Sequence, residues 1–116
     1  MSADSFILHE DAVCRIEKST DPAGLRLYGS LDVDARSVLD RELENALGDG
    51  RDLHVDLSQL EFIEVGCIHI LLDVAAHLDL DGCRLVLLGP NPTVRRIIAI
   101  GQQAWPRNVE IIPRPT

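Results

Sequence analysis

Aromatic residues and long hydrophobic runs are both scarce in this sequence. Phe, Trp and Tyr together make up 3% of the 116 residues, so the hydrophobic core must be built from Leu, Ile, Val and Ala. No apolar run approaches the roughly 18 residues that a membrane-spanning helix needs. The N-terminus lacks the basic start and apolar stretch of a signal peptide. We therefore expect a cytoplasmic protein with no direct membrane insertion.

Positive charge is also in short supply. Eleven Lys and Arg residues stand against 19 Asp and Glu residues, which gives a formal net charge of −8, and no basic cluster stands out beyond Arg95 and Arg96. Nucleic-acid binding depends on neutralising phosphates with cations. We therefore expect no nucleic-acid partner, and an acidic surface that suits solubility or a protein partner with a basic face.

The three cysteines have no close spacing and lie among apolar residues. This pattern is typical of reduced thiols in a core, and it predicts no disulfide framework. Cys67 lies at a predicted helix start, where a thiol pKa can be lowered, but no third orienting group accompanies it. We predict no catalytic residues, no enzymatic activity and no cofactor.

Strand and helix patterns alternate along the chain. Extended segments are expected at residues 6–8 and 12–17, followed by a turn at 20–24, and strands at 25–31, 52–57, 83–89 and 109–112. Helices are expected at 32–48, with Asp32 or Asp34 as cap and Gly48 at the end, at Val65–Leu80, and from the turn at 90–93 to Gly101, with Asn91 or Thr93 as cap.

This order predicts a single α/β domain over residues 1–116, with a mixed β-sheet and helices packed mainly on one face. Its core covers about residues 10–112, and residues 113–116 form a Pro-rich tail. The length is sufficient to bury a hydrophobic core without disulfides or metal.

His69, Asp73 and His77 are spaced by four residues on the second predicted helix. Imidazole and carboxylate groups with this spacing can supply neighbouring ligands for zinc or another transition metal. The same residues are also typical of a solvated helix flank, which we take as the default, and we predict no metal site.

Three blocks of the chain resemble one protein family in the family's own order. The first is RLYGSLDVDARSVLDREL, the central one is HVDLSQLEFIEVGCIHILL, and the last is CRLVLLGPNPTVRRIIAIGQ. Together they extend over about residues 10–112. The chain resembles a stand-alone STAS domain of the bacterial anti-sigma factor antagonist type.

The resemblance implies a regulator of transcription that acts by partner switching in signal transduction. In the family, the dephosphorylated antagonist binds a serine-kinase anti-sigma factor and so releases the sigma factor. The kinase then phosphorylates the first Ser of an Asp-Ser-Ser-Gly motif at a helix start, which releases the antagonist. A phosphate adds roughly −1.5 to −2 charge, enough to reverse a binding equilibrium without refolding.

This sequence departs from the family at that motif. Residue by residue, Glu64 stands for the Asp, Val65 for the phosphorylated Ser, Gly66 for the second Ser and Cys67 for the Gly. No hydroxyl remains, and valine occupies what we expect to be the capping position of the helix. One interpretation is local packing, in which Val65 extends the core and Gly66 permits a tight entry into the helix.

Two functional interpretations stay open. The protein is either a constitutive antagonist that its kinase cannot switch off, or a STAS domain that acts outside this circuit. A displaced phosphorylation site at Ser58, Ser30 or Ser37 is a further alternative.

The predicted partner is a kinase-type anti-sigma factor, which would dock on the turn after Leu57 and the start of the second helix; a homodimer is also left open. The predicted partner-binding residues are Asp32, Ser58, Gln59, Glu61, Glu64, Val65, Gly66 and His69. The alternative function is a STAS scaffold or small-ligand-sensing module, as in stressosome-like assemblies or a lipid-transporter subunit.

Overall fold

A computed structural model describes residues 5–20, 22–48, 50–107 and 109–113. Most of the Pro-rich tail, residues 114–116, lies outside the described residues, as does Asp21 of the predicted turn. The strands are β1 Ser5–Glu10, β2 Cys14–Thr20, β3 Ala23–Leu31, β4 Leu53–Ile63, β5 Leu85–Leu88 and β6 Val109–Ile112. The helices are the 3-10 turn η1 Val33–Ala35, α1 Arg36–Ala46, α2 Val65–Leu80 and α3 Pro92–Ala104.

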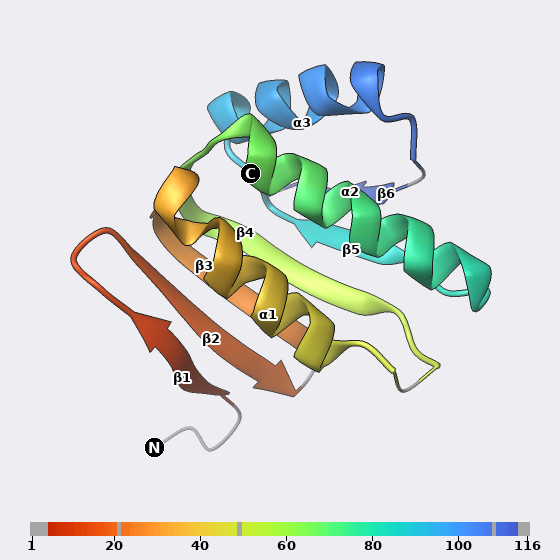
Figure 1. Ribbon diagram of the computed structural model, residues 1–116, viewed down its shortest axis with the longest axis horizontal. Coiled ribbons are helices and arrows are strands. Elements are labelled where there is room, and N and C mark those ends of the chain that lie inside the picture. Colours follow the sequence, from red (N-terminus) through yellow and green to blue (C-terminus); the bar gives the residue numbers. More distant parts are fainter. Residues whose placement is uncertain (1–4, 21, 49, 108, 114–116) are drawn as a thin grey trace.

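The six strands form one sheet in the order β1-β2-β3-β4-β5-β6. The first three strands pair antiparallel as a meander, and β3 to β6 pair parallel. Since each parallel connection advances in the same direction and such crossovers are right-handed, the helices gather on one face of the sheet. Figure 1 shows α1 and α2 side by side across that face, with α3 beside α2. The predicted mixed sheet with helices mainly on one face is confirmed.

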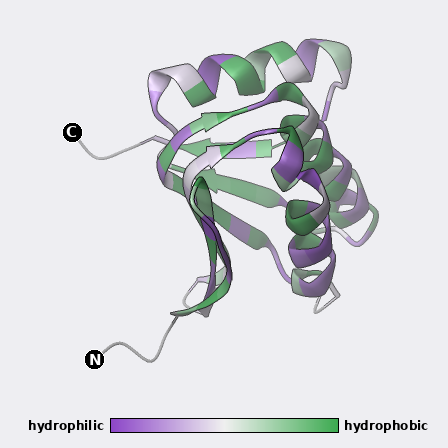
Figure 2. Cartoon of the chain, turned by 60° about the vertical axis from the view of Figure 1, so that its left-hand side comes forward, coloured by the Kyte–Doolittle hydropathy of each residue, from purple (hydrophilic) through white to green (hydrophobic). Residues whose placement is uncertain are grey.

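The core lies between this sheet face and the helices. Leu27 of β3, Leu57 of β4 and Leu39 of α1 have no exposed surface, and Ile68 and Leu71 of α2 are 1% exposed. In Figure 2 the central strands are largely hydrophobic, whereas hydrophilic segments recur along the helices. As the composition predicts, aliphatic side chains build this interior. None of the described helices is long and apolar enough to span a membrane.

β4 is longer than the sequence pattern predicts. We expected a strand at 52–57 and then a turn, but β4 continues to Ile63. The register against β3 shifts twice along this extension, between the partners of Arg26 and Tyr28 and again between those of Gly29 and Ser30. Such irregularities break the regular polar and apolar alternation, so the polar residues after Leu57 looked like a link. The predicted docking turn after Leu57 was therefore wrong.

One predicted helix end was also wrong. α1 ends at Ala46 with Leu47 as C-cap and Gly48 directly after it at a φ of +114°, as expected, but α3 continues through Gly101 to Ala104. Gly101 is a packing residue, because a Cβ there would overlap Cγ2 of Ile68 on α2. The glycine thus permits the close approach of α2 and α3 and does not end the helix.

Candidate functional site

Helix α2 begins at the end of the sheet where the carboxyl ends of the parallel strands lie, and Glu64 is its capping residue. The Glu64 carboxylate accepts hydrogen bonds from the backbone N–H groups of Gly66 at 3.0 Å and Cys67 at 2.9 Å. The expectation that Val65 occupies the capping position was wrong by one residue. Val65 is the first helical residue, and the free N–H groups of the first turn are satisfied by the longer acid before it.

Arg36 holds the Glu64 carboxylate from the start of α1. Its Nε donates to Glu64 Oε1 at 2.7 Å, and its Nη2 donates to Oε2 at 2.8 Å. Each carboxylate oxygen therefore accepts one guanidinium N–H and one backbone N–H. A two-pronged, charge-assisted arrangement of this kind fixes both distance and orientation, so it ties the start of α1 to the start of α2.

The network keeps Glu64 ionised. The hydrogen bond from Arg36 is the largest cause, and with the backbone N–H of Gly66 it lowers the pKa of Glu64 from 4.5 to about 2. The pKa of Arg36 is raised in turn by Glu64. At neutral pH the two charges offset each other, so the start of α2 presents little net charge.

Gly66 lies directly beneath the Arg36 guanidinium. A Cβ at this position would overlap the guanidinium group of Arg36. Because this group is the end of a flexible side chain it can move, but moving it breaks the fork on Glu64. The residue that stands for the second Ser of the family motif is therefore matched to Arg36.

Cys67 is a buried residue of this helix start, with no exposed surface. Its Sγ lies 3.6 Å from the backbone oxygen of Asp32. Burial, followed by the hydrogen bond and charge of Glu64, raises the pKa of the thiol to about 12. The suggestion that the helix start lowers this pKa was wrong, because desolvation and the nearby carboxylate outweigh the helix dipole.

Three large apolar side chains are exposed close in the chain to Arg36 and Glu64. We call Val33, Phe62 and Val65 the apolar rim; they are 57%, 42% and 45% exposed, respectively. β3 and β4 stay paired to their ends, where Leu31 pairs with Ile63, so Val33 and Val65, which follow these strands, emerge at the same end of the sheet. The interpretation that Val65 extends the core was wrong, since this residue is largely exposed, whereas Cys67 and Ile68 of the same helix are buried.

The other predicted partner-binding residues divide into two groups. Asp32 caps the turn η1 through the N–H of Asp34 at 3.0 Å and lies beside Cys67, so it belongs to the same edge. Ser58 and Gln59 lie within β4, and at about 3.3 Å per residue they are roughly 15–20 Å along the strand from Glu64. Glu61 is exposed and closer to the strand end.

His69 lies one turn into α2 and stacks on Trp105, with ring centroids 4.0 Å apart and planes 9° from parallel. Its Nε2 lies 3.6 Å from Asp73 Oδ1, whereas His77 Nδ1 lies 2.9 Å from the backbone oxygen of Asp73. The carboxylate and the two imidazoles of this stripe do not converge on one point. Among the described residues, the group whose potential ligand atoms do converge is His9, Asp11 and Cys14.

Arg36, Val33 and Phe62 are the site residues that the sequence pattern did not reveal. One signal was present: Arg36 is a cation in the first turn of a helix, where the dipole disfavours positive charge. Such a residue invites a search for an acidic partner elsewhere. The pattern alone does not say that this partner is Glu64, which is 28 positions further along the chain.

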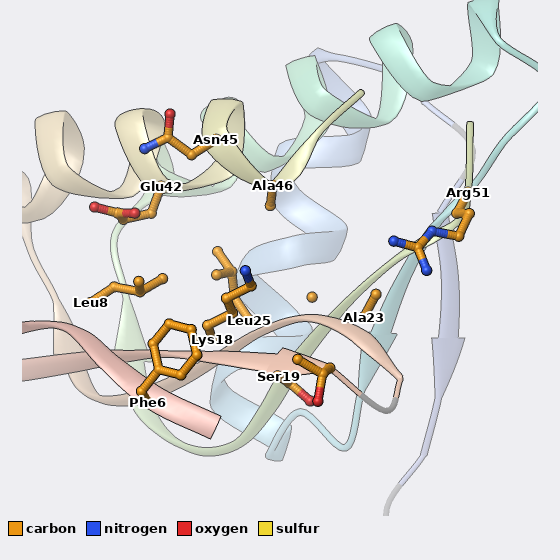
Figure 3. A pocket seen from close by; sticks show the side chains of 12 residues that line it. Phe6, Leu8, Lys18, Ser19, Ala23, Leu25, Glu42, Asn45, Ala46 and Arg51 are labelled. Atoms are coloured by element: carbon orange, nitrogen blue, oxygen red, sulfur yellow. The ribbon is translucent and has the colours of Figure 1, made fainter. Parts of the chain in front are cut away.

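A cavity of about 350 Å³ lies at the opposite end of the sheet. Figure 3 shows side chains from β1, β2, β3 and α1 around it; Phe6, Leu8 and Leu25 are among the apolar groups, and Lys18, Glu42 and Arg51 are among the polar groups. Its size lies in the range of small-molecule sites.

The mixed sheet, with capped helices starting at one edge, defines the chain as a STAS-like α/β domain. The model of the family described as "Mlab, STAS domain" matches residues 14–102, and the chain belongs to this family. No curated protein matches the sequence.

Solved structures share the fold at low sequence identity. The unphosphorylated anti-sigma factor antagonist SpoIIAA aligns with a TM-score of 0.63 and 22% identity over 78% of this chain and 77% of its own. A putative anti-sigma factor antagonist from Thermotoga maritima, TM1081, aligns with a TM-score of 0.65 and 15% identity over 85% of both chains. The murine anion transporter Slc26a9 aligns with a TM-score of 0.69 and 14% identity over 97% of this chain and 21% of the transporter.

Proposed function

We propose that this protein is a cytoplasmic anti-sigma factor antagonist-like regulator that binds a kinase-type anti-sigma factor and is not switched by phosphorylation. Its role is binding, not catalysis. The observation that carries the proposal is the start of α2, where the Glu64 carboxylate, held by Arg36, accepts the helix N–H groups and Val65 is exposed beside it. The docking surface comprises the apolar rim, Asp32, Glu61 and Glu64.

The character of this surface supports protein binding. Exposed apolar side chains grouped on one edge are typical of protein interaction sites, and the charges of Glu64 and Arg36 are mutually offset. Desolvating such a surface costs less than desolvating an isolated acid. We therefore expect an apolar contact at its centre, with affinity that depends weakly on salt.

The lack of a switch follows from the same residues. Val65 has no hydroxyl, so a kinase has no acceptor at the position that is phosphorylated in the family. A phosphate there would also meet a helix start whose Gly66 and Cys67 N–H groups already bind Glu64. Binding is then governed by the amounts of the two proteins.

The test is calorimetric titration with the kinase-type anti-sigma factors encoded in the same genome, with nucleotide present. We expect tight binding by the wild type, and at least a tenfold loss with Val65→Lys, because a cation is buried at the centre of the contact. Leu80→Lys is the matched control: Leu80 is at the other end of α2 and is 85% exposed. Failure of every anti-sigma factor to bind would refute the proposed function.

A second variant addresses the switch. Val65→Ser restores a hydroxyl at the first position of α2, and incubation with the bound kinase and ATP should add one phosphate to this variant and weaken its binding. Mass spectrometry of the recovered proteins measures the change. Phosphorylation of the wild type at Ser58, Ser30 or Ser37 would contradict a constitutive antagonist.

The cavity favours one alternative, a STAS module that senses a small ligand as a scaffold or transporter subunit. Its apolar side, with Lys18 and Arg51 at the rim, suits an amphipathic anion. The domain-level similarity to Slc26a9 is consistent with that class. Native mass spectrometry of the purified protein, with Leu25→Trp to fill the cavity, distinguishes the two: a retained ligand that this variant loses would favour the alternative.

A further inference from the structure

A group of potential metal ligands lies in the hairpin between β1 and β2, at the same end of the sheet as the docking surface, because Cys14 pairs with Gly29 near the end of β3. His9 Nε2 lies 2.8 Å from Asp11 Oδ2, and Cys14 Sγ lies 3.9 Å from the same oxygen. All three ligand atoms lie within 4.8 Å of one another. The family resemblance assigns nothing to these residues.

We propose that His9, Asp11 and Cys14 bind one divalent transition metal ion, with zinc as the best match to the ligand set. One imidazole nitrogen, one carboxylate oxygen and one thiolate sulfur are all ligands that zinc accepts. Bonds of about 2.0–2.3 Å in a tetrahedral arrangement place such ligand atoms about 3.3–3.7 Å apart. The observed separations bracket that range, so the side chains need only small movements to close on an ion.

The backbone of the hairpin holds the group in place. Asp11 Oδ1 accepts the N–H groups of Val13 at 2.8 Å and Cys14 at 2.9 Å, and the N–H of Asp11 donates to the backbone oxygen of Cys14 at 3.0 Å. The turn itself therefore uses only one oxygen of Asp11. The other oxygen, Oδ2, remains directed towards His9 and Cys14, and the bonds to Oδ1 would orient it as outer-shell contacts orient metal ligands.

Burial and charge suit a partly open site. The Cys14 residue is 5% exposed, while the side chains of His9 and Asp11 are 28% and 49% exposed. An ion would thus have protein on the thiol side and solvent on the carboxylate side, where a water can complete four-coordination. A neutral imidazole, a carboxylate and a thiolate together balance the charge of a divalent cation.

Binding requires one proton to leave. The Sγ–H bond of Cys14 breaks, its proton passes to the buffer, and a bond from Sγ to the metal forms. His9 binds through Nε2, so the metal replaces the proton that Nε2 donates to the ionised Asp11 in the free protein, and the neutral ring then carries its proton on Nδ1. We expect release of about one proton per bound ion at neutral pH, since a ligating thiol must be deprotonated.

The test is titration of the full chain with Co²⁺ as a spectroscopic substitute for zinc. A thiolate-to-cobalt absorption band in the near ultraviolet, together with the visible bands of tetrahedral cobalt, is expected for the wild type and should be removed by added Zn²⁺. Cys14→Ala should abolish the near-ultraviolet band. Cys83→Ala is the matched control, because Cys83 is also a buried free thiol, and it should keep the band.

Two milder variants keep the test independent of folding. His9→Gln and Asp11→Asn preserve side-chain size, and Asp11→Asn also retains an oxygen for the turn. Each should weaken zinc affinity by at least the roughly 10–100-fold that loss of an outer-shell partner costs, with His77→Gln unchanged. Absence of a cobalt–thiolate band in the wild type, or equal affinity for Asp11→Asn and wild type, would overturn the proposal.

Discussion

The free backbone N–H groups at the starts of α2 and α3 are capped by different kinds of side chain. Asn91 caps α3: its Oδ1 accepts from the N–H of Val94 at 2.8 Å, and its Nδ2 donates to the backbone oxygens of Leu60 and Glu61 at the end of β4. Glu64 caps α2, but it does so as an ion held by Arg36. The Asn91 cap is neutral and short, whereas the Glu64 cap is charged and depends on Arg36 of α1.

The two caps differ in how readily a partner protein can contact them. Asn91 satisfies three backbone groups and is itself half-buried, so little of it is available to a partner. The Glu64 and Arg36 pair lies next to the exposed Val65, where a partner that covers it would further desolvate an already satisfied ion pair. A helix start of the second kind is rigid before binding, which lowers the cost of ordering it in a complex.

The largest effect on stability is expected from removing each cap. Glu64→Ala should lower the free energy of unfolding by about 2 kcal/mol, at the upper end of the range for a lost cap, because two N–H groups lose their acceptor and Arg36 loses its partner. Asn91→Ala should cost about 1.5 kcal/mol for one lost cap and two lost donor bonds. Urea unfolding measures both; a Glu64→Ala penalty smaller than that of Asn91→Ala would contradict the assigned network.

A smaller loss of stability should follow when only the Arg36 side chain is replaced. Arg36→Met keeps the length of the side chain but not the fork, so Glu64 still caps α2 without an anchor. We expect a loss of stability smaller than that of Glu64→Ala, as is typical of an ion pair with an exposed member. Arg96→Met at an exposed position of α3 is the matched control. Equal stability for Arg36→Met and wild type would show that Glu64 caps without help.

The smallest effect, and the most specific, concerns pH. The folded pKa of Glu64, about 2, lies below its ordinary value of 4.5, so its stabilisation is complete above about pH 4.5 and is lost as the pH falls towards 2. The stability difference between wild type and Glu64→Gln should therefore shrink over that interval. The penalty of Asn91→Ala should stay constant, since amides do not titrate. Urea unfolding at pH 6, 4 and 3 provides the comparison, and a constant Glu64→Gln difference would contradict it.

Much of the fold was predictable because its signals are local. The bounds of α2, Val65–Leu80, agree with the periodicity, and β6 at 109–112 agrees with its short apolar run. Short polar side chains bond to their own backbone neighbours, so Asn91 or Thr93 and Asp32 or Asp34 were the expected caps; Asn91 caps α3, and Asp32 caps the turn η1 that precedes α1. Errors arose where tertiary contacts replaced the local rule, as at Gly101, which serves helix packing, and in β4, where irregular pairing hid a strand.

The candidate site was only partly predictable. The family motif identified Glu64 to Cys67, but the pattern placed the cap on Val65. It also suggested a lowered pKa for the Cys67 thiol, whereas that pKa is raised. Arg36 was not identified, because an ion pair between residues 28 positions apart leaves no periodic trace. Ser58 and Gln59 were grouped with the helix start through their nearness in sequence, and the extended strand separates them from it.

The sequence by itself determined the order of strands and helices, the aliphatic core, and the lack of a hydroxyl at residue 65, since these depend on residue identity and short-range spacing. Only the tertiary structure decided that α1 and α2 begin side by side, so that Arg36 meets Glu64, and that Val33 and Val65 emerge at the same end of the sheet. Those contacts follow from the parallel pairing of β3 with β4, which brings together residues that are far apart in the chain.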